Sequence, residues 1–140
     1  MTVAEAIPIR PLRPPFGALG AHGQSCAWKT LEQLVTIAVA AYTDTTIEIP
    51  AGALAIAVPT RVTALIPTAA TYDVGVVGAT TRYGTGILVA AGTTSKGTND
   101  ALRYYAAATK IRITPNLQPV NDTGRVRVTV FYLEVTPPTS

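Results

Sequence analysis

The feature that most constrains this chain is a regular alternation of side chains over residues 125–135. Apolar residues occupy every second position: Val126, Val128, Val130 and Tyr132. The positions between them start charged, with Arg125 and Arg127, and become apolar from Phe131 onward. Successive side chains of a β-strand point to opposite faces. The segment therefore predicts a strand with one buried face, whose other face leaves solvent for a second contact.

Other segments carry the same β signature. Residues 110–114 alternate polar side chains with Ile111 and Ile113, and residues 45–49 place Ile47 and Ile49 on one face. Residues 30–40 have the length of a short helix, but their β-branched side chains favour a strand. We expect further strands in residues 53–65, which Pro59 interrupts, and in residues 72–77 and 85–90. Residues 92–100 read as a loop, and residues 101–108 fit either a strand or a helical turn.

Short strands separated by Gly, Pro and Asn turns are typical of β-sandwiches and barrels. The eight candidate segments predict an all-β fold, an antiparallel β-sandwich of jelly-roll-like type.

The first thirty residues have a different character. Pro8, Pro11, Pro14 and Pro15 are followed by Gly17, Gly20 and Gly23. Prolines at this spacing exclude a helix or a central strand. We predict an extended Pro/Gly-rich N-terminal arm and link over residues 1–29, ahead of a β-sandwich domain over residues 30–140. The residues expected to anchor this arm in an assembly are Ile9, Arg10, Leu12, Arg13, Phe16 and Trp28, the last as a packing anchor. The arm either folds back on its own domain or embraces a neighbouring subunit or another protein.

Composition favours a protein that works inside an assembly. Charged residues make up only 14% of the chain, against roughly 25% in ordinary soluble domains. The net charge is +3, and the basic residues are scattered, so nucleic-acid binding is not expected. The single cysteine, Cys26, excludes an internal disulfide and fits synthesis in a cytoplasm. Residues 1–10 lack signal-peptide features, and the apolar run 34–42 is too short for a membrane span.

No residue pattern indicates catalysis, a cofactor or a metal. His22 and Cys26 are the only residues of their types, too few for a structural zinc site. Asp44 and Glu48 are the nearest candidates for a carboxylate pair, but a solvated strand face explains both. We therefore expect no enzymatic activity.

The tyrosines divide into two predicted groups. Tyr72 and Tyr132 alternate with apolar residues and should lie in the core. Tyr83, Tyr104 and Tyr105 flank glycine-rich loops and are the candidates for an exposed surface that binds a glycan or another partner.

Several strand-and-turn motifs resemble a module of tailed-bacteriophage virion proteins. The motifs are TDTTIEIPA (43–51), RVTALIPTA (61–69), YDVG (72–75), AAGTT (90–94), KIRITPN (110–116), GRVRVTVFY (124–132) and the final PPTS (137–140). The resemblance covers residues 30–140 and excludes the arm. It implies a β-sandwich that assembles as a homotrimer in a virion made in the host cytoplasm, and it implies no catalytic residues.

Two virion functions compete under this resemblance. The first is a capsid decoration (cement) protein, which binds the major capsid protein or another virion protein and stabilises the head shell through the arm and the sandwich. The second is a tail or fibre component that binds the host surface or a glycan. We favour the first, because the chain has no long shaft or baseplate-attachment region. A small lectin or hydrolase accessory domain outside any virion is a third possibility.

Overall fold

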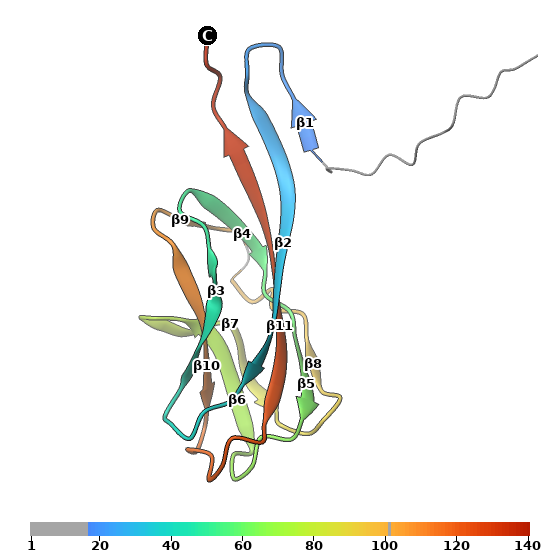
Figure 1. Ribbon diagram of the computed structural model, residues 1–140, viewed down its shortest axis with the longest axis vertical. Helices are drawn as coiled ribbons and strands as arrows, with labels where there is room; N and C mark the ends of the chain where they lie inside the picture. The colour runs from blue at the N-terminus through green and yellow to red at the C-terminus, as the bar shows by residue number, and fades with distance from the viewer. Residues whose placement is uncertain (1–16, 101) are drawn as a thin grey trace, which may run out of the picture.

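The computed structural model describes residues 17–100 and 102–140, and this part of the chain contains eleven strands and no helix (Figure 1). The strands are β1 (Gly17–Leu19), β2 (Ser25–Thr36), β3 (Thr43–Ile49), β4 (Ala53–Ala57), β5 (Thr60–Ala64), β6 (Thr71–Val76), β7 (Ala79–Leu88), β8 (Thr94–Ser95), β9 (Arg103–Tyr105), β10 (Thr109–Pro115) and β11 (Arg125–Thr136). Arm residues 1–16 lie outside the described residues.

The strands form two antiparallel sheets that pack as a sandwich, which confirms the predicted fold class. One sheet has the order β3-β10-β6-β7. In the other, β11 pairs with β2 on one side and with β4 and β5, one after the other, on its opposite side. Strands β9 and β8 continue beyond β4 and β5, and β1 lies beside the start of β2. Most successive strands therefore alternate between the two sheets, as in a jelly roll.

Strand β11 organises the core as its alternation predicted. Val126, Val128 and Val130 are fully buried, and Tyr132 is almost so. From the opposing sheet, Ile111 and Ile113 of β10 are also fully buried, again as predicted. Because each strand presents alternate side chains to the space between the sheets, one continuous apolar cluster fills the sandwich. The predicted core tyrosines, Tyr72 and Tyr132, belong to it.

Pro59 divides an apolar stretch into two strands that share one partner. Proline has no backbone N–H to donate, so it cannot continue a regular ladder. Strand β4 ends at Ala57 and β5 begins at Thr60, and the pairing with β11 keeps one register across this break, with Ala57 opposite Phe131 and Thr60 opposite Val128. The Pro59 carbonyl accepts a hydrogen bond from the Thr129 amide at 3.0 Å, which keeps the interruption attached to β11.

Three expected boundaries shift in the structure. Strand β2 covers Ser25–Thr36, whereas the sequence predicted a strand over residues 30–40. Strand β7 begins at Ala79 rather than residue 85, directly after a turn at Gly78 whose φ of 83° suits glycine. The loop 92–100 contains the short strand β8, and residues 103–105 form a strand, which decides between strand and helical turn there.

Candidate assembly surface

A two-stranded ribbon projects from one end of the sandwich. Strands β2 and β11 pair antiparallel along their whole length, with Ser25 opposite Thr136 at one end and Thr36 opposite Arg125 at the other. Only part of this length lies over the core. Figure 1 shows β1, the start of β2 and the end of β11 extending beyond the body. At the tip, the Thr139 amide donates to the His22 carbonyl at 2.8 Å, so the C-terminal segment is attached to the β1–β2 turn.

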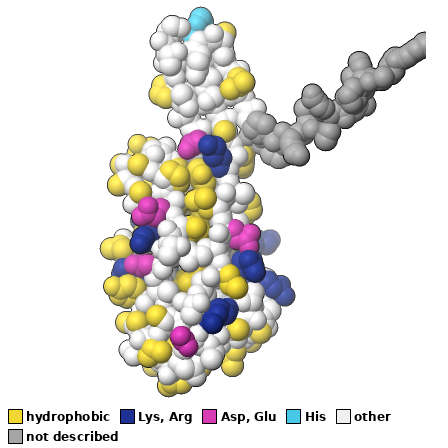
Figure 2. Space-filling view, in the orientation of Figure 1, with side chains coloured by type: hydrophobic (Ala, Val, Ile, Leu, Met, Phe, Trp, Pro, Cys, Tyr) yellow, Lys and Arg dark blue, Asp and Glu magenta, His cyan; other side chains and the backbone are white. Residues whose placement is uncertain are grey.

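The ribbon differs from the body in charge. Residues 17–28 and 135–140 contain no Asp, Glu, Lys or Arg side chain. Figure 2 shows the charged side chains of this face on the body and at the base of the ribbon, with none nearer the tip. At the base, Lys29 and Glu134 form an ion pair at 2.5 Å, and the hydrogen bond to Glu134 raises the pKa of Lys29.

An apolar row crosses the outer face of the β2–β11 sheet at this base. The register places Leu133 opposite Trp28 on one side and opposite Leu54 on the other, and Leu54 opposite Tyr104. Directly paired residues of antiparallel strands share a face, so all four side chains point away from the core. Trp28 is 54% exposed and Tyr104 is 62% exposed. We call these four residues, together with Phe131 in the neighbouring row, the outer apolar row.

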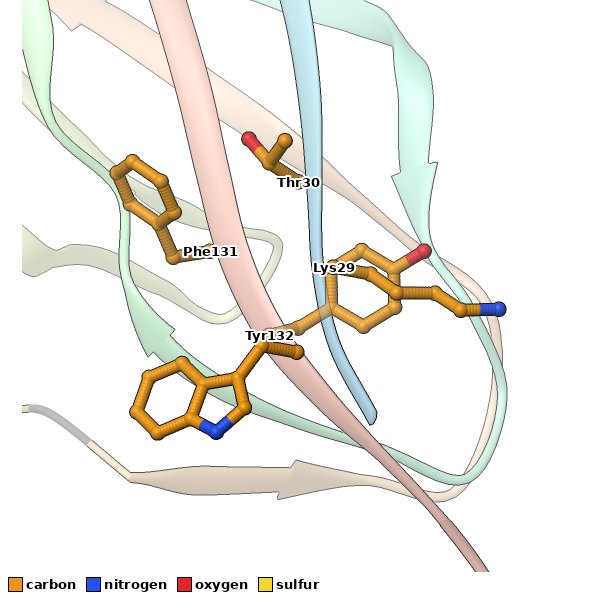
Figure 3. Close-up of a pocket in the computed structure, with 5 residues that line it drawn as sticks. Lys29, Thr30, Phe131 and Tyr132 are labelled. Atoms are coloured by element: carbon orange, nitrogen blue, oxygen red, sulfur yellow. The ribbon is translucent and has the colours of Figure 1, made fainter. Parts of the chain in front are cut away.

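An open hollow lies within this surface. It has a volume of about 620 Å³ and is lined by Trp28, Lys29, Thr30, Phe131 and Tyr132. Figure 3 shows the side chain of Phe131 on one side of the two strands and those of Lys29 and Tyr132 on the other. The register places Trp28 opposite Leu133, and therefore on the same side as Phe131. Phe131 is 42% exposed, so two aromatic side chains offer uncovered surface here.

The structure tests the predicted arm residues only in part. Ile9, Arg10, Leu12, Arg13 and Phe16 lie outside the described residues. Trp28 lies in β2, where it is half-exposed rather than packed into its own domain. The sequence carried a signal for the neighbouring surface, because the outer face of β11 changes from charged to apolar at Phe131. No local pattern in the sequence indicates that Leu54 belongs to this surface, because Leu54 joins the outer apolar row only through its pairing with Leu133.

The prediction that Tyr83, Tyr104 and Tyr105 are all exposed is wrong for two of the three. Tyr83 is fully buried and Tyr105 is 7% exposed, while Tyr104 alone is exposed. The reason is that residues 103–105 form a strand, so the adjacent Tyr104 and Tyr105 point to opposite faces. The predicted binding role therefore rests, among these tyrosines, on Tyr104.

Tyr83 and Tyr105 belong to an internal polar network. Their hydroxyl groups lie 2.6 Å apart, and Arg82 Nη1 donates to the Tyr105 hydroxyl at 3.2 Å. Burial, together with the bond to Tyr105, raises the pKa of Tyr83 far above its usual value. Asp100 holds the charged end of the network through ion pairs with Arg82 and Arg103. These contacts attach β7 to β9, which gives both tyrosines a structural role.

Asp44 is engaged by an arginine and does not form a pair with Glu48. Arg112 donates to the two carboxylate oxygens of Asp44 at 2.7 and 2.9 Å, and its guanidinium lies 3.6 Å from the centre of the Tyr42 ring. The hydrogen bonds from Arg112 lower the pKa of Asp44.

Three arginines of the strands lie on different sheets. Arg112 lies on the outer face of one sheet, whereas Arg125 and Arg127 lie on the outer face of the other, so the three do not form one patch.

Within residues 17–100 and 102–140, no group of three or more His, Cys, Asp or Glu side chains is arranged to hold a metal ion. His22 lies in the exposed turn at the ribbon tip, and Cys26 is a partly buried free thiol in β2. The same part of the chain contains no helix long and apolar enough to cross a membrane.

Comparison with known proteins gives a likeness in fold to a solved structure. No protein-family model matches the sequence, and no curated protein matches it. Among solved structures, the fold is similar to a chain described as "Cyanophage Pam1 capsid asymmetric unit", with a TM-score of 0.53 and 23% sequence identity. The match covers 96% of this chain and 99% of the other, so the two chains are nearly equal in length. At this level of identity, the likeness establishes a shared β-sandwich fold over almost the whole chain.

Proposed function

We propose that the protein is a non-enzymatic structural component of a bacteriophage virion, most specifically a capsid decoration (cement) protein that stabilises the head shell as a homotrimer. The observation that carries this proposal is the fold likeness to a chain from a cyanophage capsid asymmetric unit. That chain is about as long as this one, so a phage capsid contains a small protein of this fold as a separate chain.

The surface of the molecule supports a life inside an assembly. The outer apolar row and the uncharged ribbon leave large apolar side chains in contact with solvent, including Leu19, Trp28, Tyr104 and Val135. Contiguous exposed apolar surface is characteristic of protein interfaces. Interface cores are also poor in charge and rich in aromatic residues, as this region is.

A tail or fibre component that binds a glycan is the second candidate. Trp28 and Tyr104 are exposed aromatics in one cross-strand row, and such side chains offer a flat apolar face with a polar edge. The burial of Tyr83 and Tyr105 removes two of the three tyrosines that favoured this function. A lectin-like domain outside any virion would use the same row.

Copy number in purified virions separates these functions. Quantitative mass spectrometry against the major capsid protein should give a ratio of the same order as that protein, because a decoration protein covers the whole shell. A few copies per particle would overturn the cement function in favour of the tail. Absence from virions would overturn both and would make glycan-array binding the next measurement. Native mass spectrometry of the purified chain tests the homotrimer directly.

A further inference from the structure

We propose that the hollow at Trp28 and Phe131 receives the proline-rich segment 8–15 of a neighbouring copy of this chain. The inference deepens the homotrimer part of the proposed function, on which it rests, by naming the contact that holds the copies together. The docking contact itself does not depend on whether the homotrimer belongs to a virion or on its place there.

The hollow has the character of a receptor for an extended segment. Leu133 lies directly opposite Trp28, so Trp28 and Phe131 present uncovered aromatic faces on the same side of the sheet. Proline-rich segments in the polyproline II conformation dock on aromatic-lined grooves, because their stiff backbone loses little entropy on binding. An open hollow of about 620 Å³ on a sheet surface accommodates a few residues of such a segment.

Segment 8–15 has the matching period. A polyproline II helix has three residues per turn. Pro8, Pro11 and Pro14 would therefore share one edge of the helix, and Ile9, Leu12 and Pro15 a second edge. Arg10 and Arg13 fall on the third edge. Two apolar edges can face the aromatic hollow while the basic edge points outward.

A carboxylate next to the hollow can bind the basic edge of the segment, which carries Arg10 and Arg13. Glu32 is two positions beyond Thr30 on the same face of β2, and its side chain is half-exposed. It already accepts a hydrogen bond from Arg127 at 2.5 Å. A carboxylate has room for more than one donor, so Glu32 can also accept from an incoming Arg10 or Arg13. The other residues that line the hollow include one cation, Lys29, which Glu134 neutralises.

The position of β1 favours the segment of a neighbour over the chain's own. Gly17 pairs with Ala27, which directly precedes Trp28, so β1 lies beside the hollow of its own chain. In the polyproline II conformation, residues 8–15 would span about 25 Å at roughly 3.1 Å per residue. With only Phe16 between Pro15 and Gly17, a stiff segment of the chain's own would have to turn directly before β1 to cross from the free edge of β2 to Phe131 on β11. Docking on the next copy needs no reversal at Pro14 and Pro15, and repeated around a ring it closes with cyclic symmetry.

Trp28 is the only tryptophan, so its fluorescence reports on the hollow alone. The experiment mixes two full-length variants. The first, Trp28→Ala, keeps the segment but has no tryptophan. The second, Pro11→Gly/Leu12→Asp/Pro14→Gly, keeps the hollow but has a disabled segment. Addition of the first to the second should shift the Trp28 emission to shorter wavelength and protect it from acrylamide quenching, in a saturable manner. If Trp28→Ala does not fold, Trp28→Phe serves as the tryptophan-free partner.

The matched control is the chain that combines Trp28→Ala with the three segment substitutions, which should produce no shift. Leu88→Ala, a change at an exposed position of the other sheet, should leave association of the wild-type chain unchanged. A silent mixture together with a wild-type emission that is blue-shifted at every concentration would show own-chain docking and overturn the proposal. A silent mixture with exposed Trp28 in the wild-type oligomer would also overturn it.

The two proposals fail separately. A silent mixture with a virion copy number near that of the capsid protein would overturn the docking but leave the cement function. A saturable shift with no copies in virions would do the reverse.

Discussion

Strands β2 and β11 pass through two environments in one molecule. Within the body, their inner faces are covered by β10 and the rest of the opposite sheet, and Val126, Val128 and Val130 are fully buried. In the ribbon, the same ladder of pairs continues to Ser25 and Thr136 with no second sheet to cover it. The backbone pairing is alike in both regions, and the covering layer differs.

The comparison separates what forms a strand from what stabilises it. An isolated two-stranded hairpin is marginally stable in water, because pairing alone buries little apolar surface. The ribbon is held because its strands are anchored in the body and because β1 and Thr139 add local hydrogen bonds at the tip. Its exposed aromatic and aliphatic side chains therefore contribute little to the stability of the isolated chain.

The largest expected effect comes from the same substitution placed in both regions. Val128→Asp buries a carboxylate at a fully buried position and should lower the free energy of unfolding by more than about 4 kcal/mol. Val135→Asp, at an exposed position of the same strand, should change it by less than about 0.5 kcal/mol. Urea denaturation of the two variants measures both. Equal losses would mean that the ribbon is as firmly packed as the body.

A second test compares adjacent tyrosines. Tyr105→Phe leaves the buried Tyr83 hydroxyl without its partner and removes the acceptor of Arg82, so we expect a loss of about 2 kcal/mol. Tyr104→Phe changes an exposed side chain and should have no measurable effect on unfolding. Thermal and urea denaturation distinguish the two. A tolerant Tyr105 would contradict a structural role for the network.

The ion pair on the body predicts a pH-dependent effect. Arg112 lowers the folded-state pKa of Asp44 below the unfolded value of 3.8, so the pair contributes stability that is fully present above pH 3.8. That contribution is lost as the pH falls through the folded-state pKa. Asp44→Asn should lower the free energy of unfolding by about 1 kcal/mol at pH 7, with a deficit that disappears at low pH. Denaturation from pH 7 to pH 2 measures it, with the exposed Glu48→Gln as the control. A deficit that persists at pH 2 would assign the loss to packing.

The smallest effect is expected at the base of the ribbon. Trp28→Ala removes one cross-strand contact with Leu133 and should lower the free energy of unfolding by less than about 1 kcal/mol in dilute protein. The difference from wild type should increase with protein concentration if the hollow is covered by another copy. Denaturation at two concentrations checks both points. A large loss in dilute protein would place Trp28 in the folding core of its own chain.

The sequence predicted elements whose pattern is local. The faces of β11 and β10 and the interruption at Pro59 follow from side-chain period and from the chemistry of proline, which a short window of residues contains. The burial of Tyr83 was not predictable in this way, because its hydroxyl partner lies 22 residues further along the chain. Leu54 and Trp28 likewise meet only because both strands flank β11. Pairing between distant segments decides which residues share a surface, and composition does not show it.

Strand β11 also has a consequence for the order of events during synthesis. It is made after every strand that it joins, and β2, β4 and β5 all require it as their common neighbour. The strands of the other sheet, β3, β6, β7 and β10, also precede β11 in the chain. The sheet that contains β2, β4 and β5 can form only when β11 emerges. The long sequence separation between β2 and β11 makes this pairing slow. Until then, the apolar faces of β2, β4 and β5 are open to contact with chaperones or with other nascent chains.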